Sequence, residues 1–150
     1  MEKIYEIQAI KQEVRETTKN RYTIRSPFDV AEHAYNLIGE LDREAFLVMV
    51  LNTKNHIIAY HQCHLGSLNS SVVHPREVFK AAILNNGASI IGIHAHPSGD
   101  PTQSQEDVLV SRRLSEAGKI LGIEFIDSII IGEKVNGRVE HISLKEKGYL

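Results

Sequence analysis

The sequence predicts a single domain of the α/β (α+β) class, built as a mixed β-sheet flanked by helices. Its 150 residues are 42% hydrophobic and 24% charged, which are ordinary values for one globular domain. Short apolar runs typical of buried strands interleave with longer segments whose apolar residues recur at helical spacing. Two of the strand-like runs are separated only by a polar turn, which indicates a hairpin. A sheet with a hairpin and helical crossovers is mixed, not purely parallel.

The chain is predicted to divide into two regions. Residues 1–25 are predicted to form an extended segment or hairpin ahead of the domain proper, which covers 26–150. The first helix is predicted over 27–40, because Ser26 supplies a capping hydroxyl and Pro27 occupies the first turn. Extended stretches are expected at 3–15 and 20–25, on either side of a polar turn.

The remaining elements follow from periodicity and from turn residues. A hairpin is predicted first, then a helix that opens with proline and closes at Asn-Gly, and a β-rich run that ends in histidines. A longer helix closed by glycine and two further strands complete the domain. The predicted ranges are strands 44–51 and 56–64, helix 75–86, strand 88–96, helix 105–121, and strands 124–131 and 138–144.

Composition excludes several classes of function. A net charge of -2 gives no electrostatic basis for direct nucleic-acid binding. Cys63 is the only cysteine, so an intrachain disulfide is impossible and a reducing compartment is expected. The N-terminus lacks the apolar stretch of a signal peptide, and the longest apolar run, 45–51, is too short to span a membrane. We therefore expect a soluble cytoplasmic domain. Any homo-oligomer is expected to form through exposed strand edges in 1–25.

His94 and His96 are the strongest candidates for chemistry. They lie two residues apart on a predicted strand, so their side chains leave from the same face. Two such imidazoles suit a divalent transition metal, although many pairs of this kind are simply histidines at a strand end. Asp107, in the first turn of the next helix, would complete a His₂-carboxylate set. Ser104 and Asp107 also have the spacing of a capping box, and the two interpretations are compatible.

Other polar groups are interpreted structurally. His61, Cys63 and His64 resemble a second metal cluster, but on a strand His64 points away from the other two. Ser98 lies in a Pro-Ser-Gly-Asp-Pro turn and lacks the strand-elbow-helix setting of a serine nucleophile.

The segment H-A-H-P-S-G-D-P-T-Q-S-Q-E-D, from His94 to Asp107, resembles the H-x-H-x₇-S-x₂-D signature of JAMM/MPN+ metallopeptidases. The stretches 42–55, 68–82 and 96–101 resemble the RadC family more specifically, and the resemblance covers roughly 26–150. Ala95 and Gln103 depart from the family pattern, but neither is a ligand position. The resemblance implies an MPN/JAMM-like fold, with an outline similar to cytidine deaminases.

The resemblance also implies a mechanism. One zinc ion per chain would be held by His94, His96 and Asp107. Glu44, at the start of a strand upstream, would act as the proton-transferring base, and Ser104 would donate a hydrogen bond to the developing oxyanion. The implied function is a zinc-dependent hydrolase, a metallopeptidase or isopeptidase that uses a metal-activated water on a peptide or protein substrate.

Two alternatives belong to other classes. A nucleobase deaminase would require H-x-E and P-C-x-x-C motifs, which this sequence lacks. An accessory or binding module associated with DNA repair or DNA-processing proteins, without peptidase activity, is the second hypothesis. The sequence leaves the substrate and the scissile bond open.

Overall fold

The structure, a computed structural model, describes residues 1–6, 12 and 22–150. Its helices and strands in chain order are α1 (Pro27–Ile38), β1 (Ala45–Leu51), β2 (Ile57–Leu65), α2 (Pro75–Val78), α3 (Lys80–Leu84), β3 (Ser89–Ala95), α4 (Gln105–Leu121), β4 (Glu124–Val135) and β5 (Arg138–Ser143).

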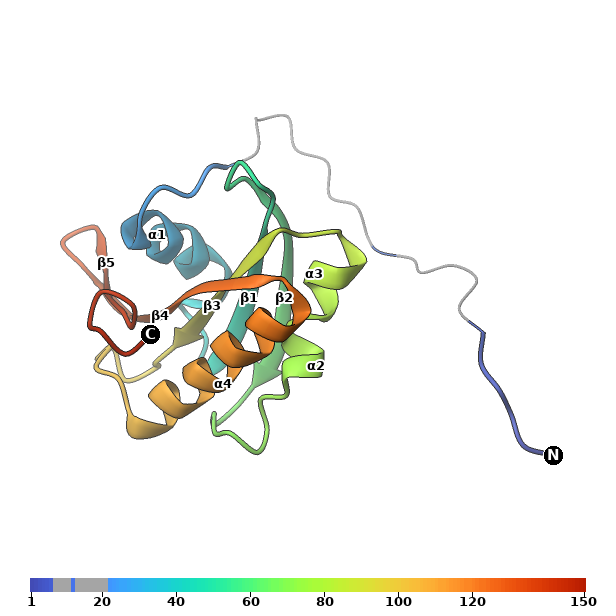
Figure 1. Ribbon diagram of the computed structural model, residues 1–150. Helices are drawn as coiled ribbons and strands as arrows, with labels where there is room; N and C mark the ends of the chain where they lie inside the picture. The colour runs from blue at the N-terminus through green and yellow to red at the C-terminus, as the bar shows by residue number, and fades with distance from the viewer. Residues whose placement is uncertain (7–11, 13–21) are drawn as a thin grey trace.

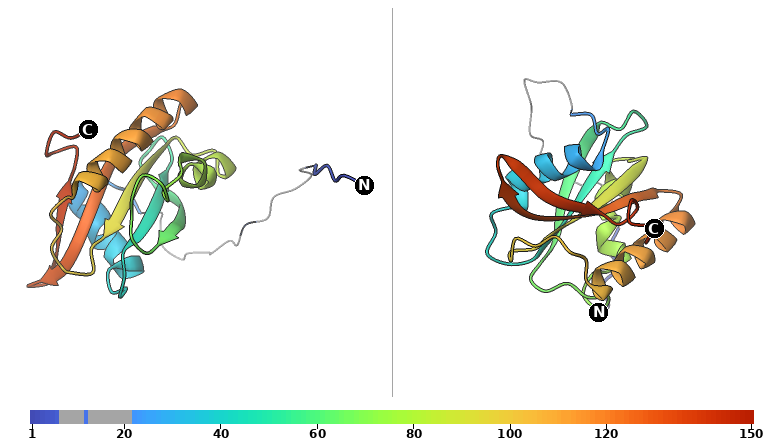
Figure 2. Two further views of the ribbon diagram at one scale, coloured as in Figure 1. Left: turned by 90° about the horizontal axis from the view of Figure 1, so that it is seen from below. Right: turned by 90° about the vertical axis from the view of Figure 1, so that its left-hand side faces the viewer.

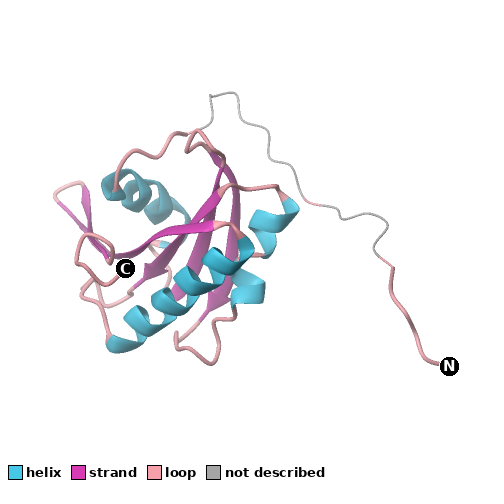
Figure 3. Ribbon diagram, viewed as in Figure 1, coloured by secondary structure: helices cyan, strands magenta, loops and turns pink. Residues whose placement is uncertain are grey.

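The strands form one sheet in the order β2-β1-β3-β4-β5 (Figure 1). Strand β1 is antiparallel to both β2 and β3, β3 is parallel to β4, and β4 is antiparallel to β5. The parallel pair is joined by α4, which is the usual crossover for such strands. The predicted mixed sheet flanked by helices is therefore confirmed (Figure 3).

Helices cover both faces of the sheet. Helix α1 lies on one face, and α2, α3 and α4 lie on the other (Figure 2). Every residue of β1 is buried. Because successive strand side chains point to opposite faces, Leu47 and Met49 pack on the α1 side while Phe46 and Val48 pack on the α4 side. A strand that is apolar at every position needs this cover on both faces.

Capping residues determine where two of the helices begin. Ser26 and Asp29 form a complete capping box at the start of α1, and Ser104 and Asp107 form another at the start of α4. Gly122 ends α4 in the left-handed conformation, with φ of 72°. The predicted helix 105–121 is reproduced, while the predicted helix 27–40 ends at Ile38.

The predicted helix 75–86 is wrong as a single element. It is interrupted at Phe79, where φ is -86° and ψ is -7°, and this divides it into α2 and α3. The Phe79 side chain is fully buried in the core cluster shared with α4 and β3. Tertiary packing at this residue therefore decides local geometry that periodicity could not predict.

The last hairpin is longer than predicted. Strand β4 continues to Val135 instead of ending at 131, and β5 pairs with it through a two-residue turn. Asn136 and Gly137 form that turn with φ of 49° and 77°. Asn-Gly is the strongest short-range hairpin signal, so the sequence did contain this information.

The N-terminal segment joins the edge of the sheet at β2. Thr23 pairs with His56, and the Ile24 N–H donates to the Asn55 carbonyl at 2.9 Å. Only 22–25 of the predicted extended stretch 20–25 are described, and there Thr23 forms an isolated bridge outside any strand. Most of the predicted stretch 3–15 lies outside the described residues. No helix in the described part of the chain is long and apolar enough to cross a membrane.

Candidate metal centre

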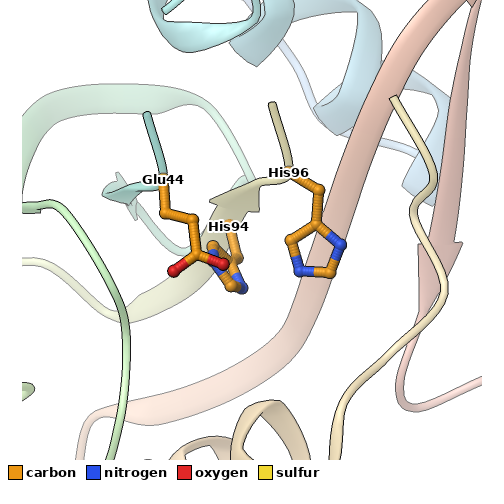
Figure 4. Close-up of side chains that lie close together, drawn as sticks. All are labelled: Glu44, His94 and His96. Atoms are coloured by element: carbon orange, nitrogen blue, oxygen red, sulfur yellow. The ribbon is translucent and has the colours of Figure 1, made fainter. Parts of the chain in front are cut away.

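The register of two strands brings Glu44, His94 and His96 together. Phe46 in β1 pairs with His94 in β3, so these two side chains share one face of the sheet. Glu44 precedes Phe46 by two residues and His96 follows His94 by two, so both lie toward the same end of the antiparallel pair. Side chains two residues apart on a strand share a face. That is the α4 side, because Phe46 packs in the cluster that contains residues of α4. The three side chains converge beyond the ends of the two strands (Figure 4).

Glu44, His94 and His96 can hold a metal ion. Each offers one ligand atom, and these atoms all lie within 4.8 Å of one another. Oε1 of Glu44 is 3.8 Å from Nε2 of His94. No other group of three His, Cys, Asp or Glu side chains meets this criterion within 1–6, 12 and 22–150. The His61, Cys63 and His64 side chains on β2 accordingly do not form a second centre.

Asp107 reaches both histidines from the first turn of α4. Its Oδ1 is 2.9 Å from Nδ1 of His94, and its Oδ2 is 3.3 Å from Nε2 of His96. Oδ2 also accepts a hydrogen bond from the Ser104 N–H at 2.7 Å. The same carboxylate therefore closes the capping box and contacts both imidazoles, but the group of three that meets the metal-ligand distance criterion among the described residues contains Glu44 in place of Asp107.

The hydrogen bonds of His96 require a positive charge beside it. Nδ1 lies 2.9 Å from the carbonyl oxygen of Asp100, and a carbonyl can only accept, so Nδ1 carries the hydrogen. In the neutral ring, Nε2 would then direct its lone pair at the Asp107 carboxylate, which also only accepts. Two facing acceptors repel each other unless a proton or a metal ion lies between them.

His94 has the complementary arrangement. Its Nδ1 faces Asp107 Oδ1 and must donate to it, which leaves Nε2 as the free acceptor of the neutral ring. Nε2 is buried and has no hydrogen-bond partner in the described part of the chain. A buried, unpaired polar atom destabilises a fold by about 1–3 kcal/mol. A metal ion at this nitrogen would remove that penalty, so the donor set fits a transition metal such as zinc.

The electrostatics of the metal-free centre follow from these contacts. Burial opposes ionisation of Asp107, but hydrogen bonds from His94, His96 and the Ser104 N–H more than offset it and hold its pKa well below the usual range. For His96, burial disfavours the charged ring, yet its contacts with Asp107 and Asp100 raise its pKa above the ordinary value. A proton on His96 therefore supplies the positive charge between its Nε2 and the Asp107 carboxylate.

Ser104 and Glu44 have different environments. Oγ of Ser104 accepts from the Asp107 N–H at 3.1 Å, which leaves the hydroxyl hydrogen available to donate. Oε2 of Glu44 accepts from the Leu68 N–H at 3.0 Å. The Glu44 side chain is 34% exposed, whereas that of Asp107 is 5% exposed.

Two backbone groups of the centre were not predicted from the sequence. One is the Asp100 carbonyl, which orients His96 from the loop after β3. That loop turns at Gly99, with φ of 87°, and packs on β4, where the Glu133 N–H donates to the Gly99 carbonyl at 2.9 Å. The glycine between Ser98 and Asp100 was the available signal for this turn. The other group is the Leu68 N–H, for which the sequence contains no signal.

Cys63 is a structural residue. Its thiol donates to the Phe46 carbonyl at 3.7 Å, and burial raises its pKa to about 12. A thiol of that pKa stays protonated at neutral pH and is neither a good metal ligand nor a good nucleophile.

Comparison with known proteins identifies the family. Residues 24–149 match the RadC-like JAB domain. The chain belongs to the RadC-like JAB domain family. This agrees with the resemblance of the His94–Asp107 segment to the JAMM/MPN+ signature, and with the mixed sheet flanked by helices.

Relatives at about half identity carry the name UPF0758 protein. The chain is 49% identical over 135 residues to the UPF0758 protein of Bacillus pumilus (strain SAFR-032), covering 90% of this chain and 58% of the relative. It is 52% identical over 130 residues to one from Geobacillus sp. (strain WCH70), covering 87% of this chain and 55% of the relative. This RadC-like chain thus spans a little over half the length of these relatives.

Proposed function

We propose that this RadC-like JAB domain is a zinc-dependent hydrolase that cleaves peptide or isopeptide bonds in a peptide or protein substrate. The observation that carries the proposal is the arrangement of His94, His96 and Asp107. Nε2 of His94 is buried without a hydrogen-bond partner among the described residues, Nε2 of His96 faces the Asp107 carboxylate, and Glu44 lies beside them, so one cation would satisfy these groups together. Membership in a JAB family supports the same chemistry.

Two ligand sets share the two histidines. In the first, Asp107 is the third ligand and Glu44 stays free to transfer protons. In the second, Glu44 is the ligand and Asp107 only orients His94 through Nδ1. We favour the first set, because His94, His96 and Asp107 have the spacing of the JAMM/MPN+ signature and the buried Asp107 carboxylate lies 3.3 Å from Nε2 of His96. The contact of Asp107 with Nδ1 of His94 is the hydrogen bond that the second set also uses. Glu44 is partly exposed, and one of its oxygens is already engaged by the Leu68 N–H.

The chain's own residues then have distinct roles. Zinc held by His94, His96 and Asp107 would supply the chemistry of a Lewis acid, which activates water near neutral pH. Glu44 would accept a proton at Oε1 and deliver it to the leaving amine. The free hydroxyl hydrogen of Ser104 would donate to the developing oxyanion, which in other enzymes lowers the barrier by ~2.7–4 kcal/mol.

The test combines metal content with turnover. Untagged protein is measured by mass spectrometry for bound metal, and the zinc-loaded protein is then incubated with a mixed peptide library and with isopeptide-linked peptides. The proposal expects about one zinc per chain in the wild type and none in His94→Ala/His96→Ala. Glu44→Gln should keep the zinc and lose cleavage, because the amide cannot accept the proton.

Three results would count against the proposal. Absence of metal from the wild type, even after zinc is added, would remove its basis. Loss of zinc from Glu44→Gln would favour the second ligand set. Zinc retention without cleavage of any library member would point instead to a binding module in which the metal stabilises the fold.

A further inference from the structure

The loop between β2 and α2, residues 66–73, is held to the candidate base from one side. The Gly66 N–H donates to the Glu44 carbonyl at 2.7 Å, and the Leu68 N–H donates to Oε2 of Glu44 at 3.0 Å. The Leu68 N–H is the one hydrogen-bond donor to the Glu44 side chain in the part of the chain that the structure describes. Oε1, the other oxygen, faces His94. The position of the Leu68 amide therefore sets which way the carboxylate points.

The same loop is held to α4 from the other side, at Ser70. The Ser70 N–H donates to Oε2 of Glu106 at 3.3 Å, and its carbonyl accepts from the Arg113 guanidinium at 2.6 Å. Glu106 and Arg113 lie seven residues apart, two helical turns, and so project from the same side of α4. Both hydrogen-bonding groups of one peptide residue are thus fixed by two charged side chains, which form stronger hydrogen bonds than neutral groups.

Helix α4 therefore contacts the centre twice. Its first turn presents Asp107 to the histidines, and its outer side holds the loop whose amide binds Glu44. Leu68 also packs against the core cluster, and the Ser67 carbonyl lies 3.0 Å from Nε2 of His64, so the contacts at Ser70 add a second attachment on the other side of Leu68. The attachment at Ser70 lies two residues from Leu68, close enough to restrict the amide there.

We propose that Arg113 and Glu106 are positioning residues of the RadC-like domain. They hold loop 66–73 so that the Leu68 N–H orients the Glu44 carboxylate toward the candidate metal centre. This inference rests on the proposed function for its catalytic consequence, but its structural part is independent of any metal or substrate.

The first test is amide hydrogen exchange of the full chain, resolved by residue with NMR spectroscopy. Arg113→Ala and Glu106→Ala should each make the Ser70 and Leu68 amides exchange about tenfold faster or more, because the loop opens locally. The effect at Leu68 is the informative one, since its N–H donates to Glu44 and to neither substituted side chain. Arg113→Lys, which can still donate to the Ser70 carbonyl, should restore part of the protection.

Arg112→Ala is the matched control. Arg112 is an equally exposed neighbour, but its guanidinium donates to the Tyr149 carbonyl at 3.0 Å and so holds the C-terminal tail instead of the loop. It should leave the Leu68 and Ser70 amides unchanged. Leu68 protection that stays at the wild-type level in both Arg113→Ala and Glu106→Ala would overturn the proposal.

A second test applies once a cleaved peptide is found. Arg113→Ala should lower kcat by about 10- to 100-fold through misplacement of the base, with KM and zinc content unchanged. An unchanged kcat would contradict the proposal. A wild type that cleaves nothing would refute the proposed function instead. The exchange result would still decide whether Arg113 and Glu106 hold the Leu68 amide in place.

Discussion

At the scale of single residues, the Asp107 carboxylate and the nitrogens of His94 and His96 form a centre that would be stabilised by a cation. Asp107 contributes a buried negative charge, and His94 and His96 contribute nitrogens whose hydrogens are already assigned by Asp107 and Asp100. In metal-free protein a proton fills this role in part, and in loaded protein zinc would fill it. The two cations therefore compete for the same nitrogens.

This competition makes the effect of metal on stability depend on pH. The pKa of His96 is raised in the folded metal-free protein. A raised pKa adds stability below the unfolded value, near 6.5, and that stability is lost as pH rises through the folded value. Zinc binding instead strengthens as pH rises, because its ligands must be deprotonated. The difference in Tm between zinc-loaded and chelated protein should therefore be larger at pH 8 than at pH 6.

Scanning calorimetry at both pH values, with and without a chelator, measures this difference. His96→Gln removes both the titrating ring and a proposed ligand, so it should abolish the difference in Tm between zinc-treated and chelated protein at both pH values. A difference in Tm that is equal at the two pH values, or larger at pH 6, would contradict competition between the proton and the metal.

Substitutions at Asp107 and Ser104 distinguish metal binding from helix capping. Asp107→Asn keeps the shape and an oxygen for the Ser104 N–H, but it removes the charge between the imidazoles. Zinc affinity should fall by more than the ~10–100-fold typical of outer-layer substitutions. Ser104→Ala removes a helix cap and should cost about 0.5–2 kcal/mol of stability while zinc content stays the same.

Competition with a fluorescent chelator and urea unfolding provide the two measurements. If Asp107→Asn bound zinc like the wild type, Asp107 would be only a helix cap, and the His₂-carboxylate set would have to be completed by Glu44.

At the scale of elements, the last turn of α4 lies very close to the backbone that leads into β4. Gly118 makes that approach possible. A Cβ built at this position would lie 2.5 Å from the Ile123 carbonyl oxygen and 3.2 Å from the Phe125 nitrogen. Both are backbone atoms and cannot move without displacing β4.

Gly118→Ala should therefore destabilise the domain, although alanine favours a helix over glycine by about 1 kcal/mol. Overpacking typically costs about 1–3 kcal/mol, and here it should outweigh the helix preference. Urea unfolding measures the change, with the exposed Glu116→Ala on the same helix as a control expected within about 0.5 kcal/mol of the wild type. An alanine variant more stable than the wild type would show that α4 can shift outward freely.

At the scale of the whole molecule, the buried core begins late in the chain. Its first buried hydrophobic residue in the described parts is Ile24, and its last is Leu144. The family match covers nearly the same stretch, 24–149. The Tyr22 carbonyl accepts from the Ile57 N–H at 2.9 Å, so the sheet edge needs the chain from about residue 22.

A fragment of residues 22–150 should therefore fold alone. We expect a single cooperative unfolding transition and the same zinc content as the full chain, because all described contacts of the centre lie inside the fragment. Circular dichroism and metal analysis of both proteins make the comparison. A fragment that unfolds without cooperativity would show that residues 1–21 belong to the folding unit.

Much of this organisation could be predicted from the sequence alone. Local signals were sufficient for helix 105–121, where Ser104 and Gly122 mark the ends, and for the hairpin around the polar turn after Leu51. The spacing of His94, His96, Ser104 and Asp107 indicated the candidate centre, because strand alternation and a helix cap act over only a few residues.

Other features were decided only by tertiary structure. The break between α2 and α3 falls at Phe79, whose ring is buried in the core. The Leu68 amide reaches Glu44 because β1 and β2 are paired. The placement of Glu44 beside His94 depends on the β1–β3 register, which joins strands separated by more than 35 residues. The sequence by itself thus indicated His94, His96, Ser104 and Asp107 as the candidate groups, since their types and local spacing are written in it. Only the fold decided which backbone atoms orient them, because those contacts join segments that no local pattern connects.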